Sequence, residues 1–235
     1  MSSILKINGI STGYGKKPVL HDVSLKVERG KTLLLVGSNG SGKRTLLKAI
    51  YGLLDVWSGS IEYEGQLLQS HGHCTLAHQL LRQGLMYVPQ KDALFEDMTV
   101  EENIRTSLLH LQNKTLMSQR LEQALAQMPM LAQRKKQLAN KLSGGERKLL
   151  SLAMVLANTP KLLLLDEPLA GVSEENVPTV LQWLDEIRNN GVTMLVVEHR
   201  IREIFDFTDS IVGLKLGQLH TEKLDTIDNI KTFMI

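Results

Sequence analysis

Residues 37–45 read GSNGSGKRT and lie between a short apolar run, Thr32–Val36, and an amphipathic stretch that ends near Ile50. The run predicts a strand that is buried on both faces, and the stretch predicts a helix. Glycines at such a junction let successive N–H groups point inward around an anion, and the helix N-terminus adds partial positive charge. We therefore expect a phosphate-binding loop rather than an ordinary glycine-rich turn, with the lysine reaching the terminal phosphates. Its expected binding residues are Gly37, Ser38, Asn39, Gly40, Ser41, Gly42, Lys43, Arg44 and Thr45.

The residue after the lysine departs from the phosphate-loop motif, which requires serine or threonine at that position. Arg44 stands there, and Thr45 follows one residue later. The change removes a hard oxygen ligand of Mg²⁺ and adds a cation where the metal would bind. It also puts positive charge at a helix N-terminus, which is unfavourable unless an anion compensates. We expect Arg44 to disturb the metal site; in the alternative, Arg44 turns outward and a water replaces the hydroxyl.

A second signal is the acidic pair that ends residues 162–167, LLLLDE. Four consecutive leucines are typical of a central parallel strand. Asp166 is expected to support a magnesium shell, and Glu167 to orient or deprotonate an attacking water. A strand that ends in a solvated acidic pair is the alternative. The phosphate loop in the same chain favours the catalytic interpretation.

A third signal is the pentapeptide LSGGE at residues 142–146, which begins a helical pattern that extends to Ala157. A serine hydroxyl and glycine amides at a helix N-terminus make an anion site, although a plain helix cap is the alternative. The chain then has two phosphate-binding ends and one lysine-bearing loop. This arrangement makes sense if two chains meet head to tail, so that each nucleotide lies between two chains. The residues concerned are Ser143, Gly144, Gly145 and Glu146.

The remaining pattern alternates strands with helices, which predicts an α/β fold with a parallel sheet. A helical pattern runs from Thr99 to about Met128, and another covers Glu174–Asn189. The other predicted strands are Ile4–Ile10, Leu20–Val27, Leu85–Val88 and Val192–Val197.

Composition narrows the functional classes. The chain has 235 residues, of which 4% are aromatic, and this argues against a base-stacking surface for nucleic acid. The formal net charge of +2 is too small to indicate an electrostatic partner. The single cysteine favours a reducing compartment, and no apolar run approaches the ~18 residues that cross a bilayer. The N-terminus has no signal-peptide pattern, so a cytoplasmic protein is expected.

One cluster of possible zinc ligands is set aside. Cys74 and His78 have the i, i+4 spacing that lets a helix present two ligands to one metal, and His71 and His73 lie beside them. No second ligand pair of zinc-finger spacing follows elsewhere. A polar surface connector is therefore the favoured interpretation.

Together these segments resemble the ABC ATPase family, and the resemblance covers essentially the whole chain. Residues 37–45 are similar to its Walker A loop, residues 162–167 to its Walker B strand, and residues 142–146 to its signature, with glutamate in the final position. Residues 169–172 stand where the family has its D-loop.

The resemblance also assigns roles to three single residues. Gln90, at the end of the YVPQ stretch, is similar to the Q-loop glutamine that contacts Mg²⁺ and the attacking water. His199 is similar to the switch histidine that senses the γ-phosphate. Tyr14 is similar to the aromatic residue that stacks on adenine, although a surface aromatic in a turn is nearly as good an interpretation.

The resemblance implies a fold and a set of partners. The expected fold class is α/β, with a P-loop NTPase parallel-sheet core, an N-terminal antiparallel β-subdomain and an inserted helical subdomain. Residues 1–235 are expected to form one ABC ATPase domain, with residues 1–90 and 156–235 as the nucleotide-binding core and residues 91–155 as the helical subdomain. ATP and Mg²⁺ are the implied cofactors. A second ABC ATPase chain, identical or different, and transmembrane permease subunits are the implied partners, and the location is the inner face of the membrane.

Two stretches are nearest to the ATPases of branched-chain amino acid importers and lipopolysaccharide exporters: residues 94–103, LFEDMTVEEN, and residues 166–172, DEPLAGV. The expected function is that of an ATP-binding transporter subunit that hydrolyses ATP to drive a membrane partner. One alternative is a nucleotide-gated dimerising module that hydrolyses poorly because of Arg44. The other is an ABC ATPase that works away from membranes.

Overall fold

The computed structural model describes residues 2–91, 93–220 and 224–235. Within them the N-terminal part forms an antiparallel sheet with the strand order β2-β1-β4-β5-β6. Strands β1 and β2 pair in the antiparallel direction, and burial largely alternates along them, so one face of the sheet packs on the core and the other faces solvent. The bounds are β1 Ser3–Tyr14, β2 Lys17–Glu28, β4 Ser58–Tyr63, β5 Gln66–Ser70 and β6 His73–Cys74.

A second sheet has the order β11-β10-β3-β9-β8-β7. Its strands are parallel except β11, which pairs with β10 in the antiparallel direction. Neighbouring strands of the parallel part come from distant segments of the chain, with helices between them, as parallel connections require. The bounds are β3 Thr32–Val36, β7 Leu85–Val88, β8 Leu162–Asp166, β9 Thr193–Val197, β10 Ser210–Lys215 and β11 Gln218–His220.

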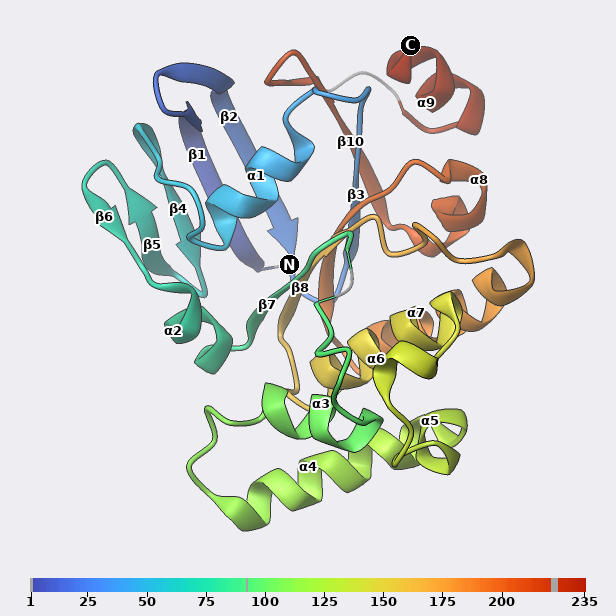
Figure 1. Cartoon of the computed structure of the whole chain (residues 1–235). Helices are drawn as coiled ribbons and strands as arrows, with labels where there is room; N and C mark the ends of the chain where they lie inside the picture. Colours follow the sequence, from blue (N-terminus) through green and yellow to red (C-terminus); the bar gives the residue numbers. More distant parts are fainter. Residues whose placement is uncertain (1, 92, 221–223) are drawn as a thin grey trace.

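The helices lie in groups around these sheets (Figure 1). Helix α1 lies beside β1 and β2, whereas α3, α4 and α5 gather at the end of the molecule away from the antiparallel sheet. In the chain, α3 to α6 are inserted between the neighbouring strands β7 and β8. The bounds are α1 Lys43–Ile50, α2 Ala77–Arg82, α3 Val100–Ser107, α4 Lys114–Gln127, α5 Pro129–Gln133, α6 Gly144–Leu156, α7 Val177–Asn189, α8 Ile201–Ile204 and α9 Ile227–Met234, with 3₁₀ turns at Ala139–Lys141, Glu174–Asn176 and Phe205–Phe207.

The parallel sheet is buried on both faces, as its continuous apolar strands predict. On one face, Leu33 and Leu35 of β3 join a core with α1 and the antiparallel sheet. On the other face, Leu34 and Val36 join a core with α3 to α7. The sheet therefore holds the two halves of the molecule together.

Most of the predicted elements are confirmed. The strands at Thr32–Val36 and Leu85–Val88 have the predicted bounds. The prediction of one helical pattern from Thr99 to Met128 is wrong, because the chain leaves the helix after Ser107 and starts α4 at Lys114. The Asn113 side chain caps α4 by accepting the N–H of Leu116, which makes a new helix start in the middle of the pattern.

No helix within the described ranges is long and apolar enough to span a bilayer.

Candidate nucleotide-binding site

The glycine-rich loop connects β3 to α1 at the carboxyl edge of the parallel sheet, which is where open α/β sheets bind ligands. Two of its glycines are required by the backbone. A Cβ at Gly37 would lie 2.1 Å from the carbonyl oxygen of Leu214 on β10. Gly42 has φ 108°, in the region that L side chains rarely adopt, and a Cβ there would lie 2.7 Å from Leu20. The close turn thus depends on residues without side chains.

Lys43 begins α1 and is almost fully buried. Its Nζ donates hydrogen bonds to the carbonyl oxygens of Gly37 and Ser38, at 2.7 and 2.9 Å. Burial lowers the pKa of Lys43, partly offset by Glu167 and Asp166 nearby. The ammonium is therefore held inside the loop, in a place from which it can reach a bound phosphate.

The acidic pair at the end of β8 is positioned by a sharp change of backbone direction. Asp166 ends the strand and is buried, whereas Glu167 has φ 53°, a left-handed conformation that is costly for a residue with a side chain. The Glu167 N–H donates to the carbonyl oxygen of Val197, at 2.8 Å, which anchors the turn to β9. Because of this turn, both carboxylates line the same cleft although they are adjacent in sequence.

Two residues from other strands converge on the Glu167 carboxylate. Gln90, just after β7, donates from Nε2 to Glu167 Oε2 at 2.6 Å. His199, just after β9, has its Nε2 3.7 Å from Glu167 Oε1. A carboxylate held between an amide and an imidazole is arranged to orient a water and pass on a proton.

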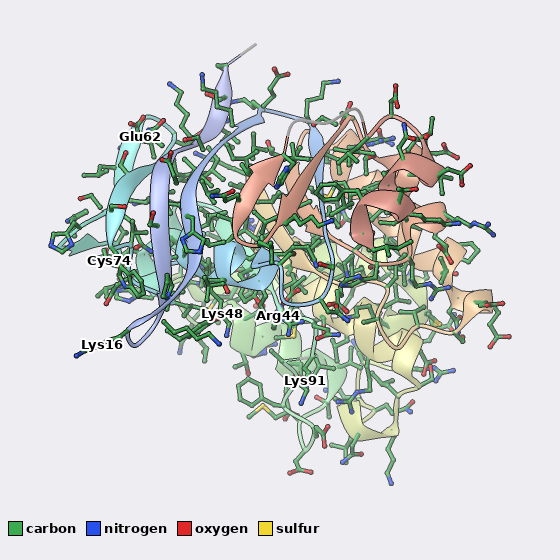
Figure 2. All side chains as sticks on the ribbon, turned by 90° about the horizontal axis from the view of Figure 1, so that it is seen from above. Lys16, Arg44, Lys48, Glu62, Cys74 and Lys91 are labelled. Atoms are coloured by element: carbon green, nitrogen blue, oxygen red, sulfur yellow. The ribbon has the colours of Figure 1, made fainter. Side chains whose placement is uncertain are left out.

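Arg44 points into this site. The alternative in which its side chain turns outward is therefore wrong. Its Nε donates to Asp166 Oδ2 at 2.6 Å, and its Nη2 donates to Gln90 Oε1 at 2.5 Å. The same Nη2 lies 3.5 Å from Glu167 Oε1. The hydrogen bond to Asp166 is the main cause that raises the pKa of Arg44, so the guanidinium carries its charge. Figure 2 shows Arg44 near the centre of the view, whereas Lys16 projects from the outer edge.

The magnesium ligands that the resemblance implies do not fit a metal with Arg44 in this place. Gln90 Oε1 and Asp166 Oδ2 both accept hydrogen bonds from the guanidinium, and Mg²⁺ would need the same oxygens at ~2.0–2.1 Å. Asp166 Oδ1 is buried and has no hydrogen-bond partner among the described residues, but it is one oxygen where a metal needs several.

The cleft around these groups has a volume of about 350 Å³. Tyr14, from the end of β1, stands at its mouth and is 48% exposed, with the Lys48 ammonium 5.8 Å from the centre of its ring. The predicted residues that line the cleft are Tyr14, Asn39, Gly40, Ser41, Gly42, Lys43, Arg44, Thr45, Asp166, Glu167 and His199, and Val19 joins them.

The Ser143 end does not line this cleft. Ser143 caps α6 in a reciprocal box: its hydroxyl accepts the N–H of Glu146, and Glu146 Oε2 accepts the N–H of Ser143 at 2.8 Å. A Cβ at Gly144 would lie 3.3 Å from the carbonyl oxygen of Gly171, so the two glycine-rich segments are in close contact. Ser143 and Gly144 are exposed, so this helix end is open to a second molecule.

Two residues of the site were not singled out from the sequence. Tyr87 on β7 donates its hydroxyl to Asp166 Oδ2 at 3.1 Å, and burial is the main cause that raises its pKa. Glu198 is buried beside the histidine and accepts the backbone N–H of Leu169, at 3.0 Å. Tyr87 stands near the carboxyl end of β7, at the sheet edge where Asp166 ends the neighbouring strand β8, and this shared edge was a usable signal for Tyr87. No local pattern marked Glu198.

The cluster with Cys74 lies far from this cleft, at the outer edge of the antiparallel sheet (Figure 2). Nowhere in residues 2–91, 93–220 and 224–235 do three or more His, Cys, Asp or Glu side chains gather so that they could hold a metal ion.

A buried lysine in a glycine loop, facing an acidic pair at the same sheet edge, is built to take the phosphates of a nucleotide. The class is that of the P-loop nucleotide-binding proteins. A family model described as "ABC transporter" matches residues 20–170. The chain therefore belongs to the ABC transporter family, in which it is an ATP-binding subunit and, by class, an ATPase.

Two ATP-binding proteins of transport or export systems are similar in sequence to this chain over most of their length. A high-affinity branched-chain amino acid transport ATP-binding protein, BraG, of Pseudomonas aeruginosa is 34% identical over 92% of this chain and 91% of its own. A lipopolysaccharide export system ATP-binding protein, LptB, of Haemophilus influenzae is 33% identical over 92% of this chain and 89% of its own.

A solved structure agrees with the fold. The crystal structure of a nucleotide-free ATP-binding cassette from an ABC transporter matches with a TM-score of 0.84 and 26% identity, over 99% of this chain and 95% of that one. The two alternatives to a transporter subunit are not favoured by these comparisons.

Proposed function

We propose that the chain binds and hydrolyses ATP to drive transmembrane permease subunits, as one half of a head-to-tail pair of ATPase chains. The observation that carries the proposal is the convergence of Gln90 and His199 on Glu167, in a cleft that also holds Lys43. A water placed against Glu167 would be oriented for attack on a terminal phosphate that Lys43 and His199 contact.

The remaining residues take supporting roles in this proposal. Tyr14 would stack on adenine at the mouth of the cleft, and Thr45 would contact phosphate beside the loop. The exposed tip formed by Ser143, Gly144 and Gly145 would close over the nucleotide held by the partner chain. Glu146 would keep that tip in shape through its reciprocal cap with Ser143. Magnesium, which the family resemblance implies, has no role in this scheme because Arg44 holds the ligands.

The permease partner would dock beside Gln90. A second pocket of about 130 Å³ there is lined by residues that follow or belong to β7, among them Val88 and Pro89, and by Met154 and Val155 of α6. The pocket joins the proposed core, residues 1–90 and 156–235, to the proposed helical subdomain, residues 91–155. The chain would act at the inner, cytoplasmic face of the membrane through these subunits. Its relatives' amino acid and lipopolysaccharide systems indicate two candidate transport classes.

The test uses Glu167→Gln, which keeps the shape of the side chain and removes the proposed base. With ATP added, with and without magnesium, gel filtration of this variant is expected to show a dimer that persists, because closure occurs and hydrolysis does not. The matched control adds Lys43→Ala, which removes the proposed phosphate contact and should leave monomers. Monomers of Glu167→Gln itself under both conditions would contradict the proposal.

A further inference from the structure

Arg44 contacts the oxygens that the family resemblance assigns to magnesium. Its Nε bonds to Asp166 Oδ2, and its Nη2 bonds to Gln90 Oε1. These two groups come from β8 and from the end of β7, whereas Arg44 comes from α1. One guanidinium thus links three elements at the point where a dication would otherwise link them.

We infer that the Arg44 guanidinium takes the place of a divalent metal in nucleotide binding, so that this chain binds metal-free ATP. The inference rests on the proposed nucleotide-binding function of the same cleft.

The shape of the guanidinium suits this task. Arginine has five N–H donors in a rigid fork, and one edge can hold carboxylate while another holds phosphate. Nη1 makes no hydrogen bond within the described part of the chain, so its donors remain for a ligand. The side chain is 46% exposed and lines the cleft. A phosphate beside Lys43 would therefore meet Arg44 directly.

The charges at the site point the same way. Lys43 and Arg44 contribute +2, and Asp166 and Glu167 contribute −2, so these four groups sum to zero before the nucleotide arrives. With serine in place of Arg44 the sum becomes −1, and a polyanionic nucleotide would meet a net negative site. A dication would then be needed to neutralise the carboxylates and bridge them to phosphate.

The experiment compares the full-length chain with Arg44→Ser, which restores the usual hydroxyl. Equilibrium dialysis with labelled ATP is run in excess EDTA and in excess Mg²⁺. In Arg44→Ser, magnesium is expected to strengthen binding by about tenfold or more, since it supplies the missing positive charge. In the native chain magnesium is expected not to strengthen binding, because metal-bound ATP and Arg44 compete for the same carboxylate and phosphate oxygens.

Lys91→Ser is the matched control. It removes one positive charge next to Gln90 in the chain from an exposed position, and the side-chain hydrogen bonds that Asp166 accepts within the described residues come from Arg44 and Tyr87. It should show the metal response of the native chain. Circular dichroism and thermal unfolding establish that each variant is folded, and Arg44→Gln, which removes the same charge and keeps most of the side-chain length, serves where Arg44→Ser does not fold.

The outcomes separate the two proposals. A native chain whose affinity rises with magnesium as much as that of Arg44→Ser overturns the role of Arg44 and leaves the proposed function in place. A native chain and variants that bind no ATP under either condition overturn both. A native chain whose affinity does not rise with magnesium, beside a rise of about tenfold or more in Arg44→Ser, supports the inference, whereas a rise in the native chain or none in Arg44→Ser overturns it.

Discussion

At the scale of single residues, Glu198 joins the two segments that carry the proposed catalytic groups. Its carboxylate accepts the N–H of Leu169, which follows the acidic pair, and the N–H groups of His199 and Arg200 at 2.8 and 3.1 Å. The residue is 2% exposed, so these three N–H groups have a buried carboxylate as their acceptor. Glu198 therefore fixes the distance between Glu167 and the histidine without facing the cleft.

Replacing Glu198 by alanine should destabilise the protein by about 2–3 kcal/mol, because three backbone donors lose a charged acceptor in the interior. Urea unfolding followed by circular dichroism measures this loss. Glu203→Ala is the control, since Glu203 forms only a partly exposed ion pair with Arg200, for which ~0–1 kcal/mol is expected. Equal losses of unfolding free energy in the two variants would show that the buried hydrogen bonds of Glu198 do not stabilise the protein more than the exposed ion pair does.

The sequence marked Arg44 as anomalous and favoured a disturbed metal site, but it did not give the contacts that the side chain makes. The phosphate-loop motif marks Arg44 as out of place by local spacing alone. Where its side chain goes depends on the end of β8 and on the residue after β7, which are far away in the chain. The left-handed turn at Glu167, which places both carboxylates in one cleft, is likewise set by the backbone contact with Val197. Such information is not present in a local pattern.

At the scale of elements, the start of α3 is held by one buried amide. Asn103 accepts the N–H of Phe95 at 2.8 Å and donates to the carbonyl oxygens of Phe95 and Met98. The residue is 0% exposed. Thr99 and Glu102 complete the helix start with a capping box. The loop that leads from Gln90 into the helices is thus tied to α3 by its own side chains.

Asn103→Ala should cost about 2–3 kcal/mol of stability, since it removes a buried side chain that bonds to the backbone of Phe95 and Met98 and takes the acceptor from the Phe95 N–H. Asn113→Ala, which removes an exposed N-cap of α4, is the matched control and should cost about 1 kcal/mol. Thermal unfolding of both variants gives the comparison. A smaller loss for Asn103→Ala than for Asn113→Ala would contradict the importance of the buried amide.

Elements buried on both faces were predictable, and those that depend on distant partners were not. The apolar run in the sequence begins and ends at the same residues as strand β3. After residue 200 no element was assigned, yet the structure has β10, β11 and α9 there. Gly213 interrupts the apolar sequence pattern of β10. It has no side chain because the ring of Phe233 on α9 packs against it, and a Cβ there would lie 2.5 Å from that ring. That contact joins residues twenty positions apart, so the pattern alone gave no sign of it.

At the scale of the whole molecule, the two proposed phosphate-binding ends lie apart. The cleft is at the carboxyl edge of the parallel sheet, and the Ser143 tip belongs to the separate start of α6. Both are exposed, and the described residues do not bring them together. The sequence led to the hypothesis of a head-to-tail pair because one chain has two such ends but only one lysine-bearing loop. In a closed two-fold pair, the loop of each chain would face the Ser143 tip of the other chain, so both loops and both tips would have a partner.

A mixing experiment tests this arrangement. Lys43→Ala destroys the loop of a chain, and Ser143→Arg blocks its tip, each made in the Glu167→Gln background. Neither variant alone should form a dimer with ATP, because every site in a pair of identical chains is then incomplete. In an equal mixture, the intact loop of one chain meets the intact tip of the other. Because neither variant pairs with itself, only mixed pairs form, and each has one complete site of two, so up to about half of the original sites return.

Gel filtration with labelled ATP measures the outcome. Recovered dimer with bound nucleotide in the mixture, and in neither variant alone, is the result that a site shared between chains requires. If loop and tip of the same chain formed the site, mixing would restore nothing, because each chain would still carry its own defect. Asn176→Arg is the control for the bulk added by Ser143→Arg. Asn176 lies next to Gly145, where an added Cβ would come within 3.3 Å of it, so a dimer lost only with Ser143→Arg locates the shared contact at the serine.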